Sequence, residues 1–189
     1  MEISTEQLKR TRSMLGSLPG NKVKAALTNA ANRAMITARS VAWEATKQTY
    51  TVKRTAFYRD TRIHVYRANN QSISAAVTFS GYLIPLIDFN VKGYRSHEKR
   101  GVRLLKAEVL SGLPKDLRHA YKANLGKYGE AIFERLTPAR DSSQQLYGPA
   151  AAHMIDNPAV LRQMDEAAKD TFDKRLDHEI GRILRGYGT

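Results

Sequence analysis

Residues 22–48 read KVKAALTNAANRAMITARSVAWEATKQ, and the pattern in this stretch decides the first part of the fold. Small and apolar side chains recur at steps of three and four residues, which is the period of one helical face. These positions are Val23, Leu27, Ala30, Ala31, Ala34, Ala38, Val41, Ala42 and Ala45. Because most are alanines, we expect a long helix that packs closely on its neighbour. The turn-like residues before it end in Asn21, a suitable helix cap, so the helix should start there.

A second helical pattern opens at Asn157-Pro158 near the other end of the chain. Proline suits the first helical position and asparagine caps it, so this pair predicts a helix start. The apolar positions that follow are Leu161, Met164, Ala168, Phe172, Leu176, Ile180, Ile183 or Leu184, and Tyr187. The opposite face is charged, and the helix is expected to end at Gly186 and Gly188. We expect the two amphipathic helices to pack on each other across a sheet.

Between the helices the period changes from helical to alternating, which predicts β-strands. Ile63 and Val65 alternate with polar residues before a turn at 69–71, and apolar residues alternate again from Ile73 to Phe79. This pattern indicates a hairpin with one buried face.

The rest of the central region contains further extended segments. Residues 83–89 are apolar but include a proline, which favours an edge strand or a buried connection. Residues 90–101 predict a basic loop, and 102–110 predict another strand that residues 111–114 interrupt. A second hairpin is expected within 119–136, and residues 137–157 are expected to be irregular.

The order of these elements predicts the fold class. Helix, strands, then helix, without strand–helix–strand alternation, is typical of an α+β protein. We therefore expect a mainly antiparallel sheet or partial barrel, flanked by a long N-terminal helix and a C-terminal amphipathic helix. A single domain over residues 1–189 is expected, with an extension at 1–20, a helix at 21–50, a strand-rich body at 60–137 and a helix at 157–186.

The net charge of +13 is unevenly distributed along the chain. Lysine and arginine outnumber aspartate and glutamate by 11 to 4 over residues 1–60 and by 13 to 6 over 61–137, but are outnumbered by 8 to 7 over 138–189. A basic body favours a polyanionic neighbour, such as nucleic acid, or an acidic protein surface. A basic face that only keeps the protein soluble is the simpler alternative.

The sequence contains few of the patterns that carry enzyme chemistry. It has no cysteine, and its five histidines are not spaced as metal ligands. It has neither a phosphate-binding glycine loop before Lys-Ser/Thr nor a G-x-S-x-G elbow. Asp88, Glu98 and Arg100 could form a metal-dependent phosphodiesterase site, but a solvated charged loop is the favoured interpretation. We expect no enzymatic activity and no cofactor.

Basic residues lie among tyrosines in the first half of the chain, a weak pattern of single-strand nucleic-acid binding. The tyrosines are Tyr50, Tyr58, Tyr66, Tyr82 and Tyr94. The residues that we expect to contact DNA or a neighbouring subunit are Lys53, Arg54, Lys92, Arg95, Lys99 and Arg100. No sequence-reading motif accompanies them, so binding without sequence specificity is expected. No apolar run approaches the length of a membrane span and the first ten residues lack a signal-peptide core, so no membrane is expected.

Several short motifs, in this order, resemble the minor tail protein Z family of tailed phages and prophages. They are Ala31-Asn32-Arg33-Ala34, Tyr50-Thr51-Val52-Lys53, Ile84-Pro85-Leu86, Tyr121-Lys122-Ala123 with Gly126, Phe133-Glu134-Arg135-Leu136, and Leu146-Tyr147-Gly148-Pro149 through Met154 and Asn157. The resemblance covers residues from about 20 to 185, and the basic loop at 90–101 has no counterpart in it.

The resemblance implies a structural protein without catalytic residues. Its expected role is tail completion and head–tail joining at the head-proximal end of the tail, after synthesis in the host cytoplasm. Other tail and neck proteins are the implied partners, a homo-oligomeric ring is expected from tail symmetry, and contact with double-stranded DNA fits the charge. A free nucleic-acid-binding protein without sequence specificity remains the alternative.

Overall fold

The computed structural model describes residues 20–93, 105–124, 126, 129–137 and 142–186. These residues divide into two compact units. Of the described residues, 20–43, 63–78 and 161–186 form one, which we call the helical unit. The second, which we call the strand-rich unit, contains 44–62 and 79–160 apart from the gaps. The expectation of a single domain stays a prediction.

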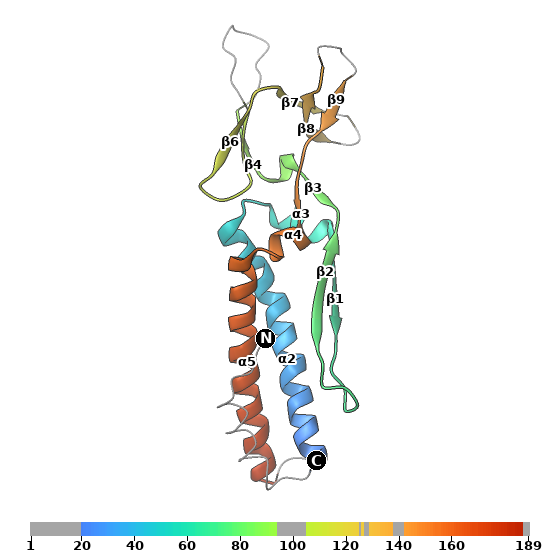
Figure 1. The fold of residues 1–189 in the computed structure, drawn as a ribbon, viewed down its shortest axis with the longest axis vertical. Helices are drawn as coiled ribbons and strands as arrows, with labels where there is room; N and C mark the ends of the chain where they lie inside the picture. The colour runs from blue at the N-terminus through green and yellow to red at the C-terminus, as the bar shows by residue number, and fades with distance from the viewer. Residues whose placement is uncertain (1–19, 94–104, 125, 127–128, 138–141, 187–189) are drawn as a thin grey trace. The chain divides into compact units, whose positions relative to one another are not determined.

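Two long antiparallel helices dominate the helical unit (Figure 1). They are α2, Gly20–Thr49, and α5, Pro158–Leu184. Residues 44–49 at the end of α2 and residues 158–160 at the start of α5 belong to the strand-rich unit. Both predicted helices are confirmed. The start of α2 differs from the prediction, because the helix begins at Gly20 and therefore includes Asn21.

The contact between α2 and α5 is direct. Ala26 and Ala30 of α2 pack on Leu176 and Ile180 of α5, and all four are buried. The expectation that the helices pack across a sheet is therefore wrong for the described residues. The physical reason is the alanine face of α2. Because methyl side chains are small, the two helices approach closely enough to pack directly, without a sheet between them.

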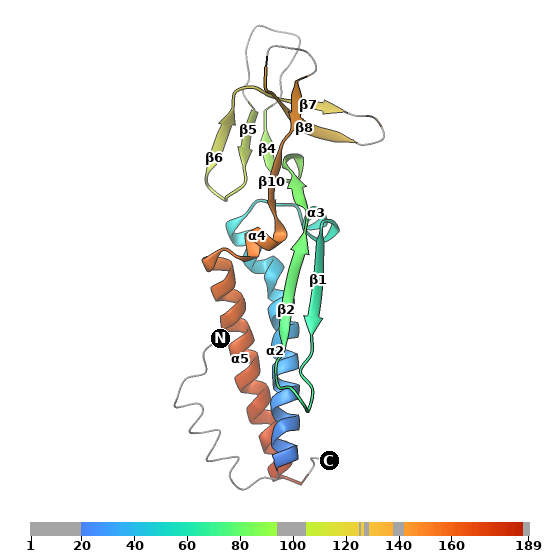
Figure 2. The same cartoon turned by 45° about the vertical axis from the view of Figure 1, so that its right-hand side comes forward.

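The predicted hairpin is present as β1, Thr61–Tyr66, and β2, Ala76–Gly81. Figure 2 shows it running beside α2. Within the helical unit the amide of Asn32 binds the backbone of Ala68 twice, with Ala68 N donating at 2.8 Å and Asn32 Nδ2 donating to Ala68 O at 3.1 Å. Ile73, expected in the second strand, instead lies outside β2 and is exposed.

Ala30→Leu should destabilise the helical unit because Ala30 is fully buried against α5. Three extra carbon atoms at such a site force the helices apart, which typically costs about 1–3 kcal/mol. Lys24→Leu on the exposed side of α2 is the control, since leucine and lysine have similar helix propensity. Urea unfolding followed by circular dichroism measures both. Equal stability of the two variants would contradict this packing.

The strand-rich unit contains short antiparallel sheets and a few helical turns. Its elements are α3 Arg54–Arg59, β3 Leu83–Pro85, η1 Leu86–Asp88, β4 Asn90–Lys92, β5 Leu105–Glu108, β6 Pro114–Leu117, β7 Ala120–Asn124, β8 Glu130–Arg135, β9 Ser143–Gln145, β10 Tyr147–Ala150 and α4 Ala151–Ile155. The strand orders are β4-β5-β6, β7-β8-β9 and β10-β3. The α+β class with antiparallel sheets is confirmed, and the described sheets do not close into a barrel.

Two predictions for this region are confirmed and two are wrong. β7 and β8 form the expected second hairpin, and β3 is an edge strand, as its proline indicated. Residues 90–92 were expected in a loop but form β4, paired with β5, while 94–101 lie outside the described residues. Residues 137–157 were expected to be irregular but contain β9, β10 and α4. β10 pairs with the distant β3, whereas β4 and β9 pair with the nearer β5 and β8. All three strands have only three or four residues, too few to show an alternating pattern in the sequence.

The strand-rich unit has its own core. Its fully buried side chains include Phe57, Ile84, Leu105, Ile132 and Met154, which come from α3, β3, β5, β8 and α4. Five separate elements therefore contribute buried side chains. The elements are too short to be stable alone, so their stability depends on this shared burial.

The ends of α5 follow the prediction. Ala159 N donates to Asn157 Oδ1 at 3.0 Å, which is the capping bond expected of Asn157 before Pro158. After Leu184 the chain reaches Gly186 with φ +78, a conformation that glycine adopts without strain and that commonly ends helices. Two positions of the predicted apolar face, Leu161 and Leu184, are exposed.

Candidate functional site

The six residues expected to contact DNA or another subunit are only partly described. Lys53 precedes α3, Arg54 begins it, and Lys92 ends β4, and all three are exposed. Arg95, Lys99 and Arg100 lie outside the described residues. Whether the six form one basic surface therefore stays a prediction.

Lys53 and Arg54 already have contacts within the strand-rich unit. Lys53 Nζ donates to the carbonyl of Ile87 at 3.1 Å and lies 3.7 Å from Asp88 Oδ1. The guanidinium of Arg54 lies over the ring of Tyr58, 5.8 Å from its centroid. Both side chains remain solvent-accessible, so a polyanion would have to compete with these contacts.

Asp88, a candidate metal ligand by its sequence position, instead binds two cations. Besides Lys53 it accepts a bond from Arg59 Nη2 at 2.8 Å, and Arg59 also binds Asp60 at 2.6 Å. The hydrogen bonds that the Arg59 guanidinium donates, first to Asp60 and second to Asp88, raise its pKa above the ordinary value. A carboxylate neutralised by two cations is a poor metal ligand, and Glu98 and Arg100 lie outside the described residues. The geometry around Asp88 thus indicates a clamp between α3 and η1.

The tyrosines of the weak nucleic-acid pattern are differently placed. Tyr50 accepts a bond from Asn157 Nδ2 at 3.1 Å, so its hydroxyl has a structural partner. Tyr66 is exposed and lies edge-on to His64, with ring centroids 4.3 Å apart. Tyr82 is the most exposed large hydrophobic residue described, at 74%. Tyr94 lies outside the described residues, so a shared stacking platform stays a prediction.

Metal-binding clusters and membrane spans are both absent from the described ranges. No group of three or more His, Asp or Glu side chains there is placed to hold a metal ion. None of the helices in these ranges combines the length and the apolar character that crossing a bilayer requires.

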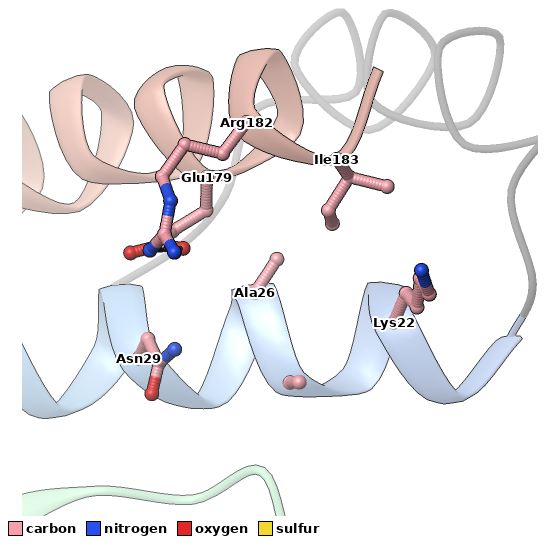
Figure 3. Close-up of a pocket in the computed structure, with 7 residues that line it drawn as sticks. Lys22, Ala26, Asn29, Glu179, Arg182 and Ile183 are labelled. Atoms are coloured by element: carbon pink, nitrogen blue, oxygen red, sulfur yellow. Dashed lines mark hydrogen bonds and ion pairs between the residues drawn. The ribbon is translucent and has the colours of Figure 1, made fainter. Parts of the chain in front are cut away.

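A polar cleft of about 170 Å³ lies between α2 and α5 in the helical unit (Figure 3). Glu179 and Arg182 extend into it from α5, opposite Ala26 and Asn29 of α2. The Glu179 side chain is 7% exposed and is paired with Arg175 at 3.1 Å and with Arg182 at 3.3 Å. The cleft therefore contains a buried carboxylate held by two half-exposed arginines, which suits a helix-packing role.

Glu179→Gln should lower the free energy of unfolding by about 1–2 kcal/mol, since the change removes the charge from a buried pair and leaves two cations beside an amide. Glu166→Gln is the matched control on the same helix. Its side chain is 70% exposed and pairs with Arg162 at 3.7 Å, so its loss should cost about 0.5 kcal/mol or less. Urea unfolding of both variants distinguishes the buried from the exposed pair. If Glu166→Gln lowers the free energy of unfolding more than Glu179→Gln does, the proposed role of Glu179 in helix packing is wrong.

An apolar groove of about 550 Å³ lies in the strand-rich unit. Its lining is Leu86, Ala107, Val109, Leu110, Leu113, Lys115, Leu117, Leu146, Tyr147, Gly148 and Pro149. Three of its apolar side chains are exposed: Leu113 at 61%, Tyr147 at 48% and Leu110 at 37%. Exposed apolar side chains gathered around a hollow are typical of an interaction site.

Sequence reasoning did not find this groove. Leu113 and Leu117 stand four residues apart with Lys115 between them, a period-two pattern that could have indicated one face of a strand. The other wall comes from residues 146–149, about thirty positions further along the chain. No pattern in the sequence connects these two segments.

The comparisons with known proteins add no relative. No family model matches the chain, and no curated protein or solved structure matches it.

Proposed function

We propose that this chain is a minor tail protein of a tailed phage or prophage that acts in tail completion and joins the head-proximal end of the tail to the filled head. The proposal starts from the ordered motifs between residues 20 and 185. It includes a place in the virion neck, contacts with other tail and neck proteins, and assembly as a homo-oligomeric ring.

The observation that carries the proposal is that the motif residues have structural contacts. In Tyr50-Thr51-Val52-Lys53, Tyr50 pairs with Leu110 in a β-bridge, and Thr51 N donates to Val109 O at 3.1 Å. Val52 is 5% exposed, and Lys53 N donates to Asp88 O at 2.8 Å. A family without catalytic residues should have motifs that maintain the fold, and these residues do so.

The second hairpin and the segment after it support the same interpretation. The rings of Tyr121 and Phe133 stack at 5.9 Å between centroids, and Tyr121 OH donates to Ser143 Oγ at 2.7 Å. Gly148 lies against the ring of Phe89, where no side chain fits. The motif residues thus make contacts that stabilise the fold, which favours a structural protein over an enzyme.

Deleting the coding sequence from the phage or prophage that carries it tests the proposal. Tails and filled heads should both form but remain unjoined, so electron microscopy should show separate particles and infectivity should fall. Expression of the protein in trans should restore joined particles. Normal virions from the deletion strain would contradict the proposed role.

The oligomeric state is tested on the purified, nuclease-treated protein by light scattering after size exclusion. A ring-sized oligomer that persists at high salt supports self-assembly. A monomer at both salt concentrations would contradict a ring that forms by self-assembly. In that case a ring could form only with the help of partner proteins.

The alternative function, nucleic-acid binding without sequence specificity, rests on the net charge of +13. Affinity that depends on phosphate contacts falls steeply as salt rises, whereas a specific protein interface responds much less. Replacing Arg95, Lys99 and Arg100 with alanine should weaken either DNA association or assembly. If neither changes, these three residues are not the contact.

A further inference from the structure

One face of the β5–β6 hairpin, whose strands are labelled in Figure 2, provides part of the lining of the apolar groove in the strand-rich unit. In this antiparallel pair Ala107 lies opposite Lys115, and Leu105 lies opposite Leu117. Side chains on a strand alternate between faces, so Lys115 and Leu117 lie on the face that also bears Ala107. The facing wall consists of Leu86 and residues 146–149.

The exposed side chains at the edge of the groove indicate the size of ligand that it suits. Leu113, Tyr147 and Leu110 remain exposed by more than a third of their surface. A small molecule that filled only the hollow would leave much of this rim in water. A segment of polypeptide covers hollow and rim together, which is how apolar anchors are buried at protein interfaces.

The positive charge of Lys115 indicates the charge of ligand that the groove suits. On the other face of the same hairpin, Lys106 pairs with Asp116 at 3.3 Å, so that face has its own acidic partner. Lys115 lies opposite Ala107 and makes no ion pair with any residue in the described part of the chain. A cation that stands between two leucines and has no ion-pair partner among the described residues is complementary to a carboxylate that arrives with apolar side chains.

We propose that this groove binds an amphipathic segment of a partner protein, in which neighbouring apolar side chains occupy the groove and an acidic side chain pairs with Lys115. The inference goes beyond the proposed tail function and does not rest on it, because the groove and its charge belong to the isolated chain. It assigns a polypeptide partner, so nucleic acid is expected to bind elsewhere or not at all.

Selection of short random peptides displayed on a surface, with the full-length protein as immobilised target, tests the proposal. Enriched peptides should share two or more apolar residues near an aspartate or glutamate. The affinity of one enriched synthetic peptide is then measured by fluorescence anisotropy against the wild type and three variants.

Leu113→Glu and Lys115→Glu should each raise Kd at least about tenfold, the effect of losing one interface anchor. Lys106→Glu is the control, because Lys106 stands next to Ala107 on β5 and therefore lies on the other face of the hairpin, where it pairs with Asp116. A peptide with lysine in place of its acidic residue should bind Lys115→Glu better than it binds the wild type. Circular dichroism establishes that each variant is folded.

Three results would overturn the proposal. The first is that no peptide family is enriched on a folded target. The second is that the enriched peptide binds Leu113→Glu or Lys115→Glu as tightly as it binds the wild type. The third is that Lys106→Glu weakens binding as much as Lys115→Glu, which would mean that only the net charge is sensed. None of these results depends on whether tails are completed, so the failure of this proposal is distinguishable from the failure of the proposed function.

Discussion

Phe57→Ala is expected to destabilise the strand-rich unit by about 3–5 kcal/mol, the usual cost of removing a buried phenylalanine ring. Phe57 lies on α3 and has no exposed surface, and it contacts the ring of Tyr58 edge-on at 5.2 Å. Alanine at this position leaves a cavity where α3 meets the rest of the unit. Because domains are marginally stable, a loss of this size should leave a large fraction of the molecules with this unit unfolded at moderate urea concentrations.

Urea unfolding by circular dichroism, combined with hydrogen exchange of residues 44–62, measures the effect and locates it. Tyr82→Ala is the control, because Tyr82 is an aromatic residue of similar size that is 74% exposed. Its replacement should change stability by about 0.5 kcal/mol or less. If Phe57→Ala were no worse than Tyr82→Ala, Phe57 would not be a core residue.

Gly81→Ala is the second change with a large expected effect, about 3 kcal/mol, at the upper end of the cost of overpacking. A Cβ atom at Gly81 would overlap the carbonyl oxygen of Asp60 and lie 3.1 Å from Thr61 Cα. These are backbone atoms, which cannot rotate away as a side chain can. The same Asp60 carbonyl accepts a bond from Tyr82 N at 3.2 Å, so moving it also breaks that bond.

Gly20→Ala is the matched control, since no atom lies within 4 Å of the Cβ that it would add at the start of α2. Thermal unfolding should show a lower midpoint for Gly81→Ala and an unchanged or slightly higher one for Gly20→Ala. Similar midpoints for Gly81→Ala and the wild type would mean that the chain at Gly81 lies further from Asp60 than the structure places it.

The site predictions show where sequence reasoning reaches its limit. Lys53, Arg54 and Lys92 are exposed, as lysine and arginine usually are, but their contact with DNA or a subunit stays a prediction. The sequence could not indicate that Asp88 and Ile87 already bind Lys53. These contacts join Lys53 to residues 34 and 35 positions further along the chain, and neither Ile87 nor Asp88 belongs to one of the motifs.

The buried Glu179 illustrates the same limit within a helix. Its position on α5 was not among the predicted apolar positions, and acidic residues are mostly exposed. Its burial depends on the alanine face of α2, which lets the two helices approach, and on Arg175 and Arg182, which neutralise the carboxylate. A residue's burial is therefore a property of the partner surface as much as of its own helix.

The sequence by itself determined the local elements: both long helices, the Asn157 cap, the glycine end of α5, and the two hairpins. Each has a repeating or capping pattern within a few residues, and such patterns report local geometry directly. Only the tertiary structure decided the direct contact of α2 with α5, the strands within residues 137–157, and the groove between β5–β6 and β10. The helix contact, β10 and the groove arise from hydrogen bonds and packing between segments far apart in the chain, for which a single sequence contains no local signal. β9 pairs with the nearby β8, but a strand of three residues is too short to show a period in the sequence.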